Sequence, residues 1–168
     1  MKKIFILIFL ILTSHISYAY SSIVFIDVDK IYNESIAGKK SNKTIFDFKN
    51  EKNKTLNILK KDIDENTEKL KNQKNVITDE EYNNQIIELQ KKIDSFNSLV
   101  NKNNIEITNL QNMIKDKYLE ILYTIVEKYS KKNLIDIVLN KKDVLIGKQT
   151  LDISDEILDI MNKEFDKF

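Results

Sequence analysis

Few side chains in this sequence could carry covalent chemistry. The chain has no cysteine and a single histidine, His15, which lies in an N-terminal segment that we expect to be removed. A protein without these residues lacks the usual general base, the thiol nucleophile and the strongest transition-metal ligands. Asp, Glu, Lys, Ser and Tyr remain, but none of them stands in a motif typical of catalysis. We therefore expect no enzymatic activity, no bound metal and no cofactor.

Lysine is the abundant functional group, and its chemistry here is electrostatic. Residues 39–78 carry a net charge of +5, residues 79–132 carry −1, and the remainder of the chain after residue 19 carries −5. A positive region of this kind can attract acidic partners, although any single lysine on a helix is more simply a solvated surface residue. The near-neutral total, the absence of arginine and the expected export argue against nucleic-acid binding, because phosphate contacts supply most non-specific affinity.

The N-terminus has the pattern of a secretory signal peptide. Lys2 and Lys3 precede an unbroken apolar run at 4–12, and small residues follow at Ser17 and Ala19. This pattern predicts cleavage between Ala19 and Tyr20. The alternative is an uncleaved anchor, but the apolar run is short for a bilayer core roughly 30 Å thick. We therefore expect export to the periplasm.

The elements that must position the lysines are two long helices. Apolar residues recur at alternating steps of four and three, the spacing of a coiled-coil seam. The stronger series, interrupted only by Asn103, is Tyr82, Ile86, Leu89, Ile93, Phe96, Val100, Ile107, Leu110 and Ile114. A weaker series, in which Lys52 and Asn66 fill gaps, is Ile45, Phe48, Leu56, Leu59, Ile63 and Leu70.

The apolar repeat stops between the two series, near 72–78. Thr78 can cap a new helix there, and Glu81 would complete a capping box. Two long helices joined by so short a turn are predicted to pack antiparallel as a hairpin. With its tip near 72–78, the hairpin would form an arm over residues 39–112, on the order of 50 Å long.

Both ends of the chain outside the arm favour a small β-rich body. We expect a strand at 23–27, a short helix at 29–35 and a turn at Gly38. A second strand at 134–139, a turn at 140–143 and a third strand at 144–146 follow the arm, and Ser154 caps a last helix. The predicted fold is therefore α+β, with a signal peptide at 1–19, a body at 20–38 and 113–168, and the arm at 39–112.

Beyond the arm, the pattern of the second long helix broadens. Its apolar residues there form a stripe wide enough for more than one neighbour, which assigns this portion to the body; the alternative is a coiled coil that continues to Lys132. The stripe is Tyr118, Ile121, Leu122, Ile125, Val126 and Tyr129.

The small sheet cannot cover its own apolar side chains, and a body of this size would gain stability by oligomerising. The residues that we expect at an interface between copies are Ile23, Phe25, Ile135, Ile137 and Leu139.

The order of these segments resembles the Skp (OmpH) family of periplasmic chaperones. The resemblance rests on the strand IVFIDVDKIYNES, on AGKK before the charged hairpin, on LIDIVLNKKDVLIG, and on the helix start at Asp152–Leu158. It implies a homotrimer joined through a β-barrel body, whose arms surround unfolded outer-membrane β-barrel proteins. It also implies a holdase that needs no ATP. The near-neutral charge departs from the basic balance of familiar relatives, and contact with a membrane surface or lipopolysaccharide stays open.

For a client-binding arm, the candidate contacts are lysines and apolar residues beside the seam. They are Lys39, Lys40, Lys43, Phe46, Lys49, Lys52, Lys54, Ile58 and Leu99. The competing interpretation is a structural coiled-coil protein of the cell envelope, which would share the export signal and the heptads but would not need strands at both ends of the hairpin.

Overall fold

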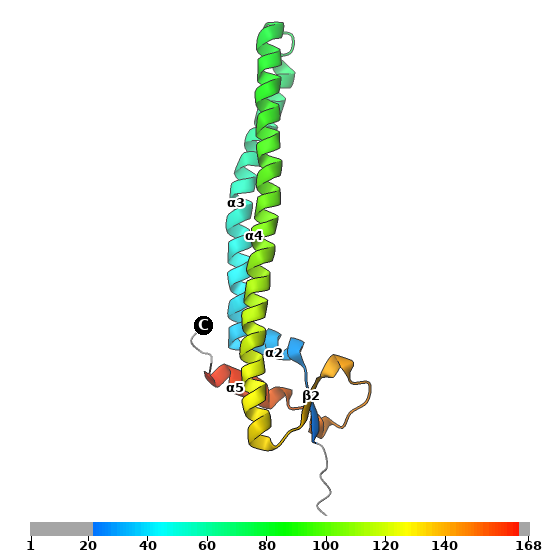
Figure 1. The fold of residues 1–168 in the computed structure, drawn as a ribbon. Coiled ribbons are helices and arrows are strands. Elements are labelled where there is room, and N and C mark those ends of the chain that lie inside the picture. The colour runs from blue at the N-terminus through cyan, green and yellow to red at the C-terminus, as the bar shows by residue number, and fades with distance from the viewer. Residues whose placement is uncertain (1–21, 165–168) are drawn as a thin grey trace, which may run out of the picture.

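The computed structural model describes residues 22–164, which form a long two-helix arm standing on a small body (Figure 1). The predicted signal peptide and its cleavage site at Ala19 and Tyr20 lie outside the described residues. The elements in chain order are β1 (Ile23–Ile26), α2 (Val28–Glu34), α3 (Ile36–Gln73), α4 (Asp79–Asn133), β2 (Ile137–Asn140), the 3-10 turns η2 (Lys141–Asp143) and η3 (Gln149–Leu151), and α5 (Ser154–Glu164).

The body contains a two-stranded parallel sheet made from both ends of the described chain. β1 and β2 pair in register, with Ile23 opposite Ile137 and Phe25 opposite Leu139. Parallel neighbours need a long crossover connection, and here the whole arm is that connection. The small sheet and the long helices thus agree with the predicted α+β fold.

The predicted third strand at 144–146 is wrong. After β2 the Asn140 side chain accepts a hydrogen bond from the backbone N–H of Lys142 at 3.2 Å, which closes the chain into η2 instead of a hairpin turn. The chain returns to the sheet only at Asp152, which makes an isolated bridge with Phe25. Residues 144–146 therefore form a loop and pair with neither of the two described strands.

The sequence predicted a turn before the arm at Gly38, but the chain breaks at Ser35. Ser35 has extended backbone and caps α3, its Oγ accepting a hydrogen bond from the N–H of Gly38 at 3.0 Å. Gly38 lies inside the first turn of α3, where a Cβ atom would come within 1.7 Å of the Tyr32 carbonyl oxygen, so the close approach of the two backbones requires glycine. Asn162 of α5 accepts a hydrogen bond from the N–H of Ile36 at 2.9 Å and ties the start of α3 to the body.

The tip of the arm agrees with the predicted helix boundaries. α3 ends at Gln73, and Thr78 caps α4 in a complete capping box with Glu81. α4 then returns alongside α3 (Figure 1), and ion pairs join Lys52 to Glu106 at 2.6 Å and Lys92 to Asp62 at 2.7 Å. The 55 residues of α4 span about 80 Å, so this helix runs from the tip of the arm into the body.

The core lies where α2, α4 and α5 pack on one face of the sheet. Val24 and Ile26 point from β1 into this core, which confirms a buried strand. The widened stripe of α4 also packs here, as predicted, with Tyr118, Leu122 and Ile125 buried. Among the described residues, the apolar side chains that are fully buried or nearly so are Ile31, Leu122, Ile125, Ile157 and Met161.

The arm has no comparable core. Within residues 39–112, all of which the structure describes, only Leu70 and Asn103 are buried. Two helices can cover each other only along a single seam. Most of the other seam residues stay half-buried, and Leu59 and Ile86 are exposed. Apolar surface therefore remains accessible along the arm.

Candidate functional site

The described residues contain no candidate metal site. No group of three or more acidic or metal-ligating side chains able to hold a metal ion occurs between residues 22 and 164. Over the same residues, none of the helices has the length and hydropathy needed to cross a membrane. The candidate functional surfaces are therefore the exposed side of the body and the two flanks of the arm.

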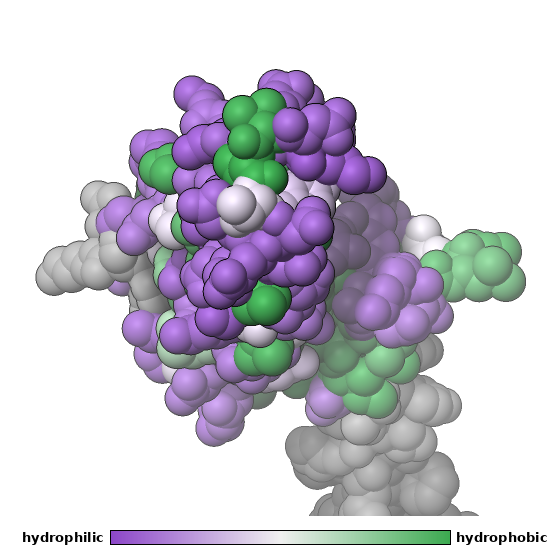
Figure 2. All heavy atoms as spheres, turned by 90° about the horizontal axis from the view of Figure 1, so that it is seen from above, coloured by the Kyte–Doolittle hydropathy of each residue, from purple (hydrophilic) through white to green (hydrophobic). Residues whose placement is uncertain are grey.

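The body leaves one face of its sheet partly open. Ile23, Ile137 and Leu139 share that face and are 42–44% exposed. The following loop carries Leu145 and Ile146, which are 98% and 90% exposed. Viewed along the arm, a hydrophobic group projects from the side of the body (Figure 2).

Two of the predicted interface residues, Phe25 and Ile135, are covered by other parts of the same chain. Phe25 is 7% exposed because the loop covers it, and a Cβ atom on Gly147 would come within 2.7 Å of its ring. Ile135 is half-buried and packs against the core of the body. The exposed apolar surface is therefore made by Ile23, Ile137 and Leu139 together with Leu145 and Ile146, two residues for which the predicted third strand was the only signal.

Asp152 and Ser154 hold this loop against β1. The Asp152 carboxylate, 7% exposed, pairs with Lys141 Nζ at 2.7 Å and accepts a hydrogen bond from the N–H of Ser154 at 3.0 Å. The Ser154 hydroxyl also donates to this carboxylate and accepts from the N–H of Asp27 at 2.7 Å. Burial opposes the charged form of Asp152, but the hydrogen bonds from Lys141 and Ser154 outweigh it and lower the pKa of the carboxyl. Asp152 and Ser154, at the helix start that contributed to the family resemblance, thus hold the loop, β1 and α5 together.

Five of the six predicted client-facing lysines lie on the outer surface of α3. Lys39, Lys40 and Lys54 are exposed, and Lys49 is half-exposed. Lys43 is also exposed and pairs with Asp47 at 2.8 Å within the same helix. Charge on these outer positions is available to a partner.

Lys52 differs from the other five because its side chain is drawn into the seam. It pairs with Glu106 and lies 4.9 Å from the centre of the Phe48 ring. The hydrogen bond from Lys52 lowers the pKa of Glu106. The weak register near Lys52 therefore marks a polar layer inside the arm.

Of the three predicted apolar contacts, two are open to solvent. Phe46 is 62% exposed and Ile58 is 70% exposed, whereas Leu99 is half-buried beside the seam. Seen end-on, the arm is mostly hydrophilic with isolated hydrophobic residues (Figure 2). The arm thus offers scattered apolar spots among charged groups.

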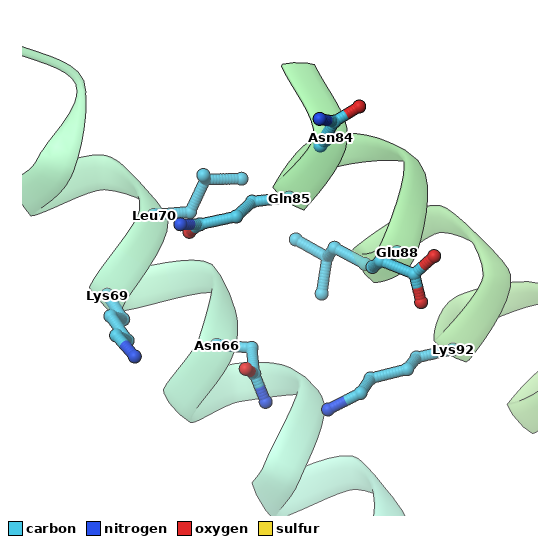
Figure 3. Close-up of a pocket in the computed structure, with 8 residues that line it drawn as sticks. Asn66, Lys69, Leu70, Asn84, Gln85, Glu88 and Lys92 are labelled. Atoms are coloured by element: carbon cyan, nitrogen blue, oxygen red, sulfur yellow. The ribbon is translucent and has the colours of Figure 1, made fainter. Parts of the chain in front are cut away.

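Several hollows follow the line where α3 and α4 meet, and two of them differ in character. The one near the tip is polar: in Figure 3 Lys92 extends from α4 toward Asn66 of α3, and Gln85 extends toward Leu70. The hollow at the root of the arm is more apolar and contains Met113, which is 61% exposed. Met113 lies next to the seam residue Ile114 but outside the heptad repeat, so the repeat does not predict Met113 as a site residue.

Comparison with known proteins identifies a family model that matches this chain and a solved structure with a similar fold. The family model described as "Outer membrane protein (OmpH-like)" matches residues 22–161. The fold is similar to the crystal structure of an OmpH-like protein from Caulobacter crescentus CB15, which was assigned as a candidate outer membrane chaperone. That likeness has a TM-score of 0.81 at 15% sequence identity and covers 89% of each chain. No curated protein sequence matches the chain significantly. Because the family model accounts for the strands, the arm and the last helix together, the chain belongs to the OmpH-like outer membrane protein family.

Proposed function

We propose that this protein is an ATP-independent holdase of the periplasm, which binds unfolded outer-membrane β-barrel proteins and prevents their aggregation during transit. The observation that carries the proposal is the family match over residues 22–161, joined to an arm that stands clear of the body. A non-enzymatic role fits this family. The signal peptide expected before Tyr20 supports export.

The surface of the arm supports weak binding at many points. Most of its seam residues are half-buried, Phe46 and Ile58 are exposed, and residues 39–78 carry a net charge of +5. An exposed ion pair contributes about 0.2–1 kcal/mol. Many such contacts on linked arms reach useful affinity through effective concentration, and none requires a particular client sequence.

The trimer is the second part of the proposal, and the open face of the body supports it. Leu145 and Ile146 are almost fully exposed in one chain. β2 pairs with β1 along one side, and no other described strand lies along its other side. In the proposed assembly, the loop of one copy covers the apolar face and the free strand edge of the next, since such edges otherwise favour uncontrolled association. Three arms would then surround one client.

An aggregation assay tests the chaperone function directly. An unfolded outer-membrane β-barrel protein is diluted from denaturant at low salt, with the mature protein present in excess over the client. The expected result is that light scattering by the client is suppressed without ATP. If scattering is unchanged, the structural envelope protein becomes the better interpretation of the coiled coil.

Salt and lysine variants test how the arm binds. Raising the salt from about 0.1 M to 1 M shortens the screening length from about 10 Å to about 3 Å, so capture of an acidic client should weaken but not vanish. Neutralising Lys39, Lys40, Lys43, Lys49 and Lys54 together should slow capture. The matched control is Lys52→Gln, which removes a charge already paired with Glu106 in the seam and should leave capture nearly unchanged.

A further inference from the structure

A groove at the root of the arm differs from the rest of its surface. It lies between α3 and α4 and has a volume of about 340 Å³, which is near the lower end of ligand sites at roughly 300–1,000 Å³. Its lining is Ala37, Lys40, Ser41 and Thr44 from α3, and Met113, Ile114, Lys117 and Tyr118 from α4.

The groove exists because small residues face large ones. α3 contributes Ala37, Ser41 and Thr44 at this level, while α4 contributes Met113 and Ile114. The Thr44 hydroxyl already donates to the Lys40 carbonyl at 3.0 Å, so it makes no demand on a ligand. Met113 remains 61% exposed at the groove although its thioether is apolar and adaptable.

The charged part of the groove lining is basic. Lys40 and Lys117 are its charged residues, and no acidic side chain belongs to the lining. The hollow near the tip differs because Glu88 lines it together with Lys69 and Lys92 (Figure 3). Apolar walls beside Lys40 complement a ligand in which an apolar group stands next to an anionic one.

We propose that this groove is an anchor site for clients, which takes one apolar side chain from an acidic stretch of unfolded polypeptide. The apolar side chain lies against Met113, Ile114 and Tyr118, and a neighbouring carboxylate of the client meets Lys40. The inference rests on the proposed chaperone function and adds a defined position to otherwise diffuse binding by the arm.

Methionine methyl groups allow the site to be observed directly. The sequence contains three methionines, and the two in the mature chain report on different places. Met113 lines the groove, whereas Met161 is 0% exposed in the core of the body. A titration of protein labelled with ¹³C at the methionine methyls, followed by NMR, therefore contains its own internal control.

The probe is a synthetic disordered peptide in which one leucine stands between aspartates in a Gly/Ser background. We expect the Met113 methyl signal to shift with added peptide and the Met161 signal to stay in place. A peptide with serine in place of leucine, and one with lysines in place of aspartates, should each bind at least about tenfold more weakly. Equal binding of all three peptides would overturn the proposal, as would a Met113 shift induced by decanoate but not by the peptide.

A matched pair of variants separates the groove from general exposure. Met113 and Ile105 both lie on α4 and are both 61% exposed, but Ile105 does not line the groove. Met113→Glu should weaken peptide binding at least about tenfold, which equals about 1.4 kcal/mol, and Ile105→Glu should not. Equal effects of the two variants would overturn the proposal, and so would a change in the oligomeric state caused by Met113→Glu alone, which would assign the groove to contact between copies.

The aggregation assay distinguishes failure of the groove from failure of the function. If the wild-type protein protects the client while Met113→Glu retains full peptide binding, the anchor site is wrong and the chaperone function stands. If the wild-type protein gives no protection at all, the proposed function fails and the anchor site fails with it.

Discussion

At Gly38 the packing of one residue decides how the arm leaves the body. The helix that begins at Ile36 passes so close to the end of α2 that no side chain fits between the two backbones. Ser35 and Asn162 satisfy the amides of the first turn of α3, at Gly38 and Ile36 respectively. The contacts of Gly38 with α2, of Ser35 with Gly38 and of Asn162 with Ile36 therefore set the direction in which the arm leaves the body.

Replacing Gly38 by alanine tests this close approach. Alanine is favoured over glycine in a helix by about 0.8–1.0 kcal/mol, but its Cβ atom would lie 1.7 Å from the Tyr32 carbonyl oxygen. The clash should dominate, and we expect Gly38→Ala to lower the free energy of unfolding by about 2 kcal/mol or more. Urea denaturation measures the change, with Asn57→Ala on an exposed position of α3 as the control. A more stable Gly38→Ala variant would show that α2 and α3 can move apart freely.

Asp152 gives the body a dependence on pH. Its pKa in the folded protein lies below the ordinary value of 3.8, so the stabilisation is fully present above the unfolded pKa and is lost as the pH falls through the folded pKa. Asp152→Asn should cost about 1.5–3 kcal/mol at neutral pH, because Lys141 and Ser154 lose a charged acceptor.

Unfolding free energies measured from pH 7 downward should show the difference between Asp152→Asn and the wild type shrinking below about pH 4. A difference that stays constant to about pH 2 would mean that the shape of the side chain matters and not its charge.

At the scale of elements, the arm is a two-helix coiled coil with a polar layer near its middle. Asn103 is 4% exposed within the apolar seam, and the Lys52–Glu106 ion pair lies beside it. A buried asparagine in such a seam costs stability while it fixes the alignment of the helices. The arm is thereby kept in register by residues that weaken it.

Substituting Asn103 by leucine should therefore stabilise the arm. We expect the free energy of unfolding to rise by about 1 kcal/mol, since a buried polar group is replaced by one that suits the seam. Asn104→Leu is the matched control, because Asn104 is exposed and its replacement should have little effect. Thermal unfolding followed by circular dichroism measures both. A fall in stability for Asn103→Leu would indicate that the Asn103 amide makes hydrogen bonds worth more than the apolar contact.

At the scale of the whole molecule, the sheet joins the two ends of the described chain across the entire arm. Ile23 pairs with Ile137 although about 110 residues separate them, and the sheet still has only two strands. So small a sheet buries little apolar surface by itself, and the open face beside it has room for other copies. The body therefore has more to gain from assembly than the arm has.

Sedimentation equilibrium at micromolar concentration should report three chains for the mature protein. Leu145→Asp with Ile146→Asp places two charges in the proposed interface and should yield monomers, because an unpaired charge is costly to bury. Val76→Asp is the control, since Val76 at the tip is also strongly exposed, at 78%, but far from the body. Replacing residues 46–111 with a short turn should leave the trimer intact. A monomer at every concentration tested would contradict the proposal.

The sequence by itself determined the features that depend on local periodicity. Alternating steps of four and three between apolar residues predicted the two long helices, and Thr78 with Glu81 placed the start of α4, because a helix and its cap are specified by residues within a few positions of one another. The wider stripe from Tyr118 onward predicted where α4 enters a core. The apolar run at 23–26 likewise indicated a buried strand.

Only the tertiary structure decided the features that depend on distant residues. The apolar pattern at 144–146 does not show that these residues form a loop beside β2 and not a strand paired with it. The pattern around Gly38 does not show that the Tyr32 carbonyl occupies the space of a side chain. The sequence placed Lys52 both at a gap in the seam and among the client-facing lysines, and only its ion pair with Glu106 across the seam shows that the charge is held inward. The groove at the root of the arm likewise exists only because Ala37 and Met113 meet across two helices. Strand pairing, close backbone approach and cavity formation are set by which segments meet in space, and local pattern does not contain that information.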